Sequence, residues 1–197
     1  MQRKPPISIV AISGSIRPQN FTFKALSVVV NELTQNNQIS VDVFDPSPFM
    51  KEGFGPSWQE AMAVLQEDVK KATAVIIATP EYHGSYSSYI KLIIENLGYP
   101  SLLSGKPIIL LGVAAGEIGA IKALEHLRSV CSHVGAMVLP GTVSVARVQE
   151  IFDAQGRCTN KNIEKRLRLL AQNLIEYLNK HVCPYDVLEE TVRGKNN

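Results

Sequence analysis

The sequence has few cysteines and no marked excess of charge of either sign. Its three cysteines, Cys131, Cys158 and Cys183, are scattered and never form a C-x-x-C pair, which argues against a disulfide framework and a zinc site. The formal net charge is +2 at pH 7, without the basic surplus typical of proteins that bind nucleic acid or anionic membranes. We therefore expect no metal, nucleic acid or membrane partner, and a small molecule as the ligand.

Long apolar runs are also missing. No stretch reaches the roughly 18 apolar residues that a membrane span needs. The first apolar run breaks at Ser13 and has no small-residue cleavage site, so it does not resemble a secretory signal. Together with the cysteine usage, these features predict a protein of the reducing cytoplasm.

What the sequence does contain suits one compact domain. Its length is 197 residues and 45% of them are hydrophobic, which is enough for a sizeable core. There is no internal repeat and no low-complexity segment. We expect a single domain over residues 1–180 and a C-terminal tail over residues 181–197.

Short apolar runs rich in Val, Ile and Leu recur along the chain and predict strands. Three of them are nearly continuous, as expected of central parallel strands that are covered on both faces, whereas ISVDVF alternates and suits a sheet edge. The five expected strands are ISIVAI (7–12), ISVDVF (39–44), TAVIIAT (73–79), PIILLGV (107–113) and AMVLP (136–140).

Between these runs, apolar residues recur every three or four positions, which is the spacing of an amphipathic helix. The first four stripes begin at Phe21, Trp58, Tyr89 and Ile121. A fifth follows Asn160, a plausible N-cap. Five strands alternating with five helices predict a doubly wound, three-layer α/β/α sandwich around a parallel sheet of order 2-1-3-4-5.

Donor groups follow the first expected strand, in the segment GSIRPQNFT. In open α/β sheets, ligands bind beyond the carboxyl ends of the strands, where the strand order reverses. Ser15, Asn20 and Thr22 supply donors near a helix N-terminus, which itself favours anions. Arg17 adds a forked charge suited to phosphate, and Gly14 can adopt a positive φ. Taken alone, the segment could also be a capped helix with a surface arginine.

Two further loops follow neighbouring strands of the predicted sheet. In the first, a proline, an acid and an aromatic precede Gly84, which predicts a tight turn that aims backbone N–H groups and the Tyr82 ring into the crevice. In the second, Ala114, Ala115 and Gly116 allow a ligand to approach the backbone. Taken singly, these could be turn packing and a helix entry. Three such loops together favour a phosphate and a flat ring, the two ends of flavin mononucleotide (FMN).

Three stretches closely resemble the NADPH-dependent FMN reductase family, flavodoxin-like proteins that include chromate, quinone and azo-dye reductases. They are GSIRPQNFTFKAL, TPEYHGSYSSYIKLIIENLG and GKPIILLGVAAGEIGAIKALEHLR. The resemblance implies a flavodoxin-like fold and hydride transfer from NADPH or NADH, through bound FMN, to a quinone, free flavin, azo dye or metal oxyanion. It also implies a homodimer or homotetramer. The alternative is a flavodoxin-like electron carrier without NADPH oxidase activity.

By this resemblance, three groups of residues would surround FMN. Those at the phosphate would be Ser15, Arg17, Asn20, Phe21 and Thr22. Those at the ring edge, acting largely through backbone groups, would be Pro80, Glu81, Tyr82, His83 and Gly84. Those along the ring's other side would be Ala114, Ala115 and Gly116.

No side chain is expected to be an obligatory catalyst, because the reactive centre is N5 of the flavin. His83 could donate a proton to a quinone product or could be a polar rim residue. Glu81 is expected to accept from the flavin ring N3–H or from a nearby backbone donor. Phe49, Phe54 and Trp58, in and after the predicted loop 45–57, would form a lid over the ring or a subunit contact, and the resemblance favours the contact.

Overall fold

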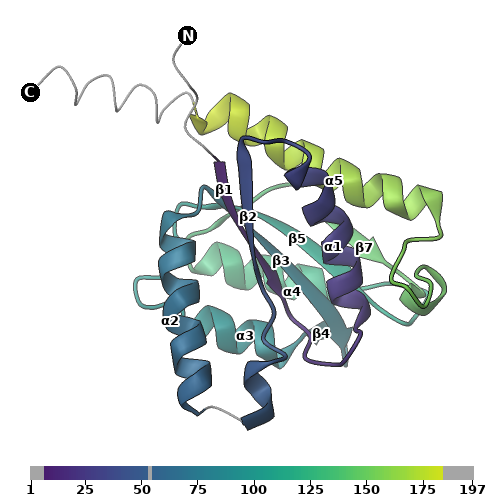
Figure 1. Ribbon diagram of the computed structural model, residues 1–197, viewed down its shortest axis with the longest axis horizontal. Coiled ribbons are helices and arrows are strands. Elements are labelled where there is room, and N and C mark those ends of the chain that lie inside the picture. Colours follow the sequence, from purple (N-terminus) through teal and green to yellow (C-terminus); the bar gives the residue numbers. More distant parts are fainter. Residues whose placement is uncertain (1–6, 53–54, 184–197) are drawn as a thin grey trace, which may run out of the picture.

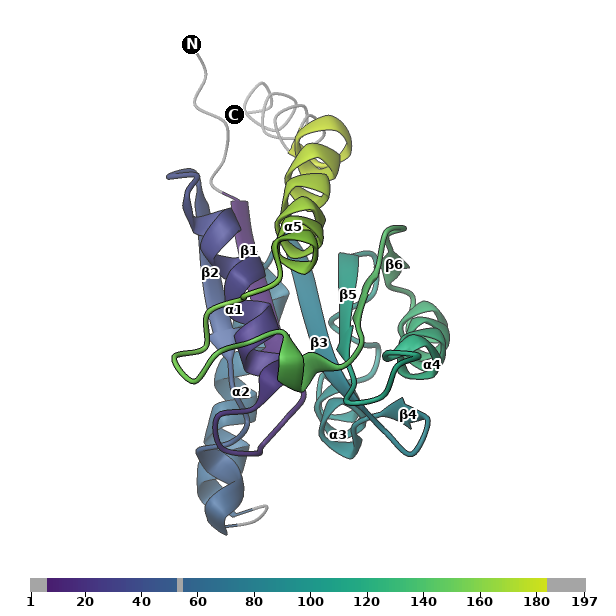
Figure 2. The same cartoon turned by 90° about the vertical axis from the view of Figure 1, so that its right-hand side faces the viewer.

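A twisted sheet with helices on both faces forms the body of the computed structural model, which describes residues 7–52 and 55–183 (Figures 1 and 2). The part of the expected tail from residue 184 onward lies outside the described residues, and so does Phe54. Residues 181–183 continue the last helix and its cap. None of the helices in the described ranges combines the length and the apolarity needed to cross a bilayer.

The five expected strands are confirmed, in the order β2-β1-β3-β5-β6, which is the 2-1-3-4-5 order of flavodoxin-like folds. The expectation of only five strands, all parallel, was wrong, because β4 pairs antiparallel with β3 and β7 also pairs with β5. Pro140, which has no N–H to donate, and Gly141, at φ 83°, end the β6 segment before the chain returns as β7. The strands are β1 (Ile7–Ser13), β2 (Ile39–Phe44), β3 (Ala74–Tyr82), β4 (Ser85–Tyr86), β5 (Pro107–Val113), β6 (Met137–Val138) and β7 (Val143–Val145).

All five expected helices are confirmed. Helices α1 and α5 cover one face of the sheet, and α2, α3 and α4 cover the other (Figure 2). Two short 3₁₀ helices, η1 and η2, lie in the connections. The helical elements are α1 (Phe21–Thr34), η1 (Phe49–Glu52), α2 (Pro56–Lys71), α3 (Ser88–Glu95), α4 (Ile121–His133), η2 (Val148–Glu150) and α5 (Lys161–His181).

Strand β1 shows why the central apolar runs are continuous rather than alternating. Ile9 and Ala11 pack beneath α1 and α5, whereas Val10 and Ile12 pack beneath α2 and α3. Each of these four side chains is at most 1% exposed. Burying an isoleucine or valine contributes about 1.5–3 kcal/mol, so both core layers stabilise the same strand and hold its carboxyl end in place.

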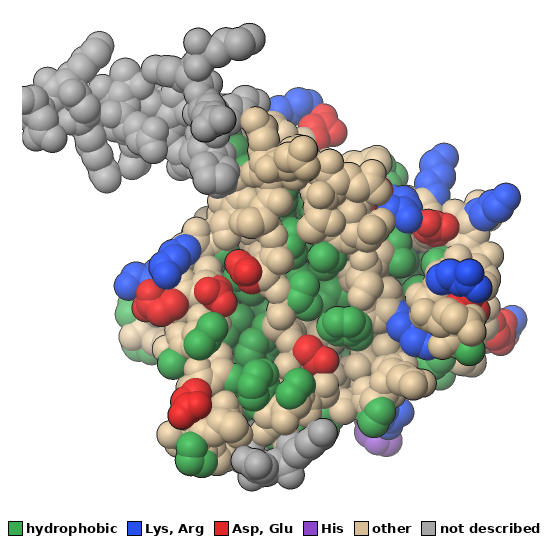
Figure 3. Space-filling view, viewed as in Figure 1, with side chains coloured by type: hydrophobic (Ala, Val, Ile, Leu, Met, Phe, Trp, Pro, Cys, Tyr) green, Lys and Arg blue, Asp and Glu red, His purple; other side chains and the backbone are tan. Residues whose placement is uncertain are grey.

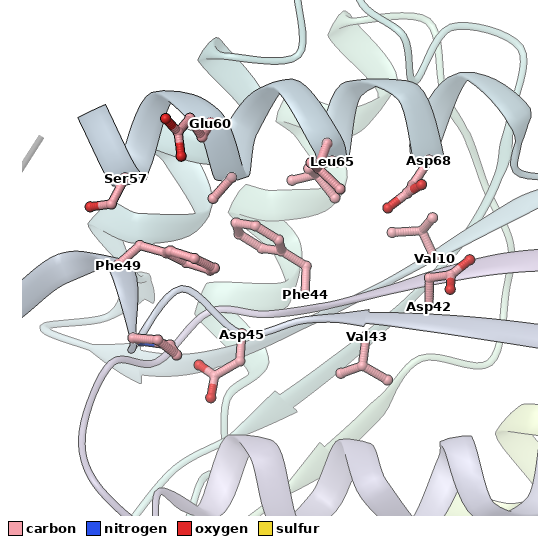
Figure 4. A pocket seen from close by; sticks show the side chains of 13 residues that line it. Val10, Asp42, Val43, Phe44, Asp45, Phe49, Ser57, Glu60, Leu65 and Asp68 are labelled. Carbon is pink, nitrogen blue, oxygen red and sulfur yellow. The ribbon is translucent and has the colours of Figure 1, made fainter. Parts of the chain in front are cut away.

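Two aromatic residues around the 45–57 loop, Phe49 and Trp58, pack with the hydrophobic core. Trp58 is only 4% exposed, and Phe44 packs edge-on against it at 6.4 Å between ring centroids. Phe49 stacks on Phe44 at 6.0 Å. The alternatives of a lid or a subunit contact were therefore wrong for Trp58, because the first turn of α2 packs back on the sheet. Phe44 and Phe49 line a groove of about 560 Å³ between β2 and α2 (Figure 4).

Gly14 ends β1 where the chain passes very close to β3 and α3. A Cβ at this position would lie 2.5 Å from Cγ1 of Ile90 and 2.8 Å from the carbonyl oxygen of Ala78. The expectation that Gly14 provides a positive φ was wrong, since it is not among the described glycines with positive φ. The position needs glycine because of this close approach.

We therefore expect Gly14→Ala to lower the free energy of unfolding by about 1–3 kcal/mol, the usual cost of forcing an extra carbon into a packed site. Gly116→Ala is the matched control, because no atom lies within 4 Å of a Cβ built there. Urea denaturation of both variants measures the difference. Equal stabilities would contradict the packing argument.

Candidate cofactor site

A cavity of about 470 Å³ lies at the carboxyl ends of β1, β3 and β5. The three loops singled out in the sequence converge on it, as the strand order requires. His83, Gly84 and Gly116 do not line it. The expected site residues that do line it are Ser15, Arg17, Asn20, Phe21, Thr22, Pro80, Glu81, Tyr82, Ala114 and Ala115.

The first loop leads directly into the N-terminus of α1. The Asn20 side chain caps this helix, with its Oδ1 accepting from the Phe23 N–H at 2.8 Å. Its Nδ2 donates to the Arg17 carbonyl at 2.9 Å, so the Asn20 amide is used within the loop. The N–H groups of Phe21 and Thr22 belong to the first turn and have no intrahelical acceptor. Both residues line the cavity, which therefore has the donors of an anion site.

Arg17 connects the first loop with the second. Its guanidinium carbon lies 4.8 Å from the centroid of the Tyr82 ring. Such a cation–π contact at an exposed site contributes only about 0.5–1 kcal/mol. A phosphate, which can accept charge-assisted hydrogen bonds of about 1.5–3 kcal/mol each, would outcompete the ring for the guanidinium.

The second loop is a hairpin in which Glu81 and Tyr82 pair with Tyr86 and Ser85. His83 and Gly84 form its tip with φ values of 50° and 75°, the positive angles of the tight turn expected from the sequence. His83 is exposed there. The hairpin thus presents Tyr82 to the cavity and His83 to solvent.

Two buried hydroxyl groups hold the first and second loops together. The Ser87 Oγ donates to the Gly14 carbonyl at 2.6 Å. The Thr79 Oγ1 accepts from the Ser87 N–H at 3.0 Å and donates to the Pro80 carbonyl at 2.9 Å. Sequence reasoning missed this role of Ser87, although its position before an apolar helical stripe marks an N-cap, and its Oγ also accepts from the Ile90 N–H at 3.3 Å.

Glu81 stabilises the start of α4. Its Oε2 accepts from the Ala123 N–H at 3.0 Å, while Ala120 at the N-cap position offers no capping side chain. The expectation that Glu81 accepts a hydrogen bond from a nearby backbone donor is therefore confirmed. A carboxylate at a helix N-terminus contributes about 0.3–1 kcal/mol. The Glu81 carboxylate is thereby engaged by the N-terminus of α4.

The segment after β7 supplies a fourth wall that the sequence did not reveal. Val148 and Gln149 line the cavity together with Ala114 and Ala115. The Val148 N–H donates to the Ala114 carbonyl at 3.0 Å, and the Gln149 Nε2 donates to the Ala115 carbonyl at 3.2 Å. No local motif marks these residues, since β7 alone brings them to the sheet. Pro18 and Gln19, which also line the cavity, adjoin predicted residues and could have been included.

These residues fit FMN. Phosphate requires donors, which the α1 N-terminus, Ser15 and Arg17 provide at one side of the cavity. A flat ring rimmed with polar atoms requires exposed backbone and an aromatic face, which the Pro80–Tyr82 segment and Ala114 offer. The volume also lies within the roughly 300–1,000 Å³ of small-molecule sites.

Comparison with known proteins supports this assignment. A family model described as NADPH-dependent FMN reductase matches residues 7–150. An NAD(P)H-dependent FMN reductase of Pseudomonas aeruginosa is 30% identical over 176 residues, which cover 85% of this chain and 91% of the relative. A quinone reductase of Escherichia coli is 29% identical over 142 residues, covering 68% and 73%. Among solved structures, the flavoenzyme NAD(P)H:(acceptor) oxidoreductase FerB of Paracoccus denitrificans has a TM-score of 0.68 at 23% identity, covering 89% of this chain and 98% of that one.

The hydrogen bond from α4 to Glu81 can be tested by mutation. Glu81→Ala should lower the free energy of unfolding by about 1 kcal/mol, because it removes the acceptor of an N-terminal helix N–H. Glu125→Ala, at an exposed position within the same helix, is the control. Thermal denaturation should separate the two variants. A Glu81→Ala protein as stable as the control would show that the bond contributes nothing.

Proposed function

We propose that this chain, which belongs to the NADPH-dependent FMN reductase family, is an FMN-dependent NAD(P)H oxidoreductase that passes electrons to a small acceptor such as a quinone. The observation that carries the proposal is the convergence of donors on the first loop with Tyr82 and Ala114 around one cavity. The quinone reductase relative supports the acceptor class.

In this proposal, the residues at the α1 N-terminus hold the phosphate. The first-turn N–H groups, Ser15, Thr22 and Arg17 act as donors, and Asn20 supports them by capping the helix. Nanomolar affinity requires about 12 kcal/mol, whereas each charge-assisted hydrogen bond contributes only about 1.5–3 kcal/mol before entropy costs. The ring contacts along Pro80–Tyr82 and Ala114–Ala115 must therefore supply a large part of the affinity.

When bound, FMN supplies the acceptance and release of hydride, so the chain needs only to bind, orient and shield it. The β3–β4 hairpin and the Val148–Gln149 segment, which both line the cavity, would hold the ring. His83 lies at the exposed tip of the hairpin and outside the cavity, which favours a rim position over proton donation. The expected homodimer or homotetramer remains a prediction that sedimentation can decide.

The activity is tested by adding NADPH to the FMN-loaded protein without oxygen. We expect the flavin absorbance to bleach and to return when a quinone is added. A steady-state series with both substrates should give the parallel lines of a two-step exchange, because donor and acceptor would occupy the same cavity in turn. A yellow protein that NADPH does not bleach would instead be an electron carrier, and failure to retain FMN would overturn both functions.

The assignment of the phosphate site is tested by Arg17→Ala. Loss of charge-assisted hydrogen bonds should weaken FMN binding by about 10- to 100-fold. Arg166→Ala, at an exposed position on α5, is the matched control. Quenching of FMN fluorescence measures both affinities. An unchanged dissociation constant for Arg17→Ala would remove this residue from the site.

A further inference from the structure

A second cavity, of about 450 Å³, adjoins the cofactor cavity. The two share the wall formed by Arg17, Pro18, Gln19 and Asn20. The second cavity continues past this wall between α1 and residues 154–156. We propose that it binds the adenosine 2′-phosphate end of NADPH, so that Lys24 selects NADPH over NADH. The inference rests on the proposed function and adds the identity of the preferred donor.

The first support is positive charge. Arg17 and Lys24 line the cavity, and within residues 7–52 and 55–183 neither has a carboxylate partner. The Lys24 Nζ donates to the backbone carbonyl of Asp153 at 3.4 Å and not to its carboxylate. The Asp153 carboxylate instead accepts from the Arg157 Nε at 2.8 Å and from the Arg157 N–H at 2.8 Å. Lys24 is thus left to attract another anion.

The second support is that Lys24 is held in place. Its Nζ lies 5.0 Å from the centroid of the Phe21 ring. Its aliphatic stem runs beside Gly156, where an added Cβ would lie 3.7 Å from the Lys24 Cγ. A lysine whose stem is packed loses less side-chain entropy when it binds a phosphate than a freely rotating one. Lys24 is therefore better prepared for binding than an ordinary surface lysine.

The third support is an exposed aromatic ring. Phe23 lines the same cavity and is 36% exposed, whereas Leu26 and Val29 of the same helix are buried. A base can stack on such a ring face. An aromatic ring beside a lysine matches an adenosine that carries a phosphate monoester, whereas a phosphate alone would make no use of the Phe23 ring.

The groove on the other side of Asp45 does not suit this ligand. It is lined by the carboxylates of Asp42, Asp45, Glu60 and Asp68 and by no Lys or Arg (Figure 4). In the space-filling view, apolar and acidic side chains share the middle of this face, while Lys and Arg lie toward its margins (Figure 3). Asp45 also lines the proposed cavity, but its carboxylate accepts from the Ser47 N–H and Oγ at 2.9 and 2.8 Å. A dianionic phosphate is therefore directed to the Lys24 side.

The proposal is tested on FMN-loaded protein by isothermal titration calorimetry with two probes, adenosine 2′,5′-bisphosphate and adenosine 5′-monophosphate. Only the first carries the 2′-phosphate. We expect Lys24→Met, which keeps the apolar stem, to weaken binding of the bisphosphate by about tenfold, the effect of one charge-assisted hydrogen bond, and to leave monophosphate binding nearly unchanged. Lys24→Arg, which keeps the positive charge, should retain the preference for the bisphosphate over the monophosphate. Lys161→Met, at the exposed start of α5, is the control.

Phe23→Ala separates the ring from the charge. It should weaken the binding of both nucleotides by a similar factor, because both carry the adenine. In kinetics, Lys24→Met should lower the ratio of kcat/KM for NADPH to kcat/KM for NADH by about the same tenfold factor. The inference would be overturned if Lys24→Met lost the same affinity for the monophosphate as for the bisphosphate. It would also be overturned if Lys161→Met lost as much affinity for the bisphosphate as Lys24→Met.

The outcomes also distinguish this inference from the proposed function. Flavin bleaching by NADPH without any preference for the 2′-phosphate would overturn the inference and leave the oxidoreductase intact. A preference for the bisphosphate that depends on Lys24, in a protein that NADPH does not bleach, would support the binding site and overturn the oxidoreductase.

Discussion

The close approach of the first loop to β3 is the constraint on which the site depends. The Gly14 N–H donates to the Ala78 carbonyl at 2.8 Å, and the Gly14 carbonyl accepts from the Ser87 Oγ at 2.6 Å. Both polar groups of this peptide segment are thus paired inside the protein, and Ile90 packs where a side chain would stand. Since α1 starts only seven residues later, at Phe21, these contacts set how far its N-terminus lies from Tyr82, and hence the width of the cofactor cavity.

A second organising principle is that the acids around the cofactor cavity and the second cavity already accept hydrogen bonds. Glu81 accepts from the start of α4, Asp45 from Ser47, and Asp153 from Arg157. The N–H and guanidinium of Arg157 hold the pKa of Asp153 below its ordinary value, so this carboxylate stays ionised and paired with Arg157 at neutral pH. The unpaired charges that remain beside the first loop are the cations Arg17 and Lys24. An anionic cofactor and an anionic donor therefore meet little repulsion there.

The sequence predicted the parts of the site that are continuous in the chain. The segment GSIRPQNFT, with its donors before an amphipathic stripe, contributes five of its expected residues to the cavity. Of PEYHG, Pro80, Glu81 and Tyr82 line the cavity, whereas His83 and Gly84 form the hairpin tip outside it. The errors concern packing between distant segments. Gly14 was assigned a positive φ, when the reason for the glycine is a neighbour 76 positions away in α3. Trp58 was placed at a lid or interface, when its partner is Phe44 on β2.

By itself the sequence determined the five main strands, the five α-helices and the chemistry of each loop, because hydrophobic period, caps and turn residues act over a few positions. Only the tertiary structure decided which of those groups are available to a ligand. Asn20 and Glu81 are both polar residues of predicted site loops, yet Asn20 caps α1 and Glu81 accepts a hydrogen bond from the first turn of α4. Val148 and Gln149 enter the site through the pairing of β7 with β5. Such contacts depend on distances that folding sets between remote residues, and no local pattern encodes them.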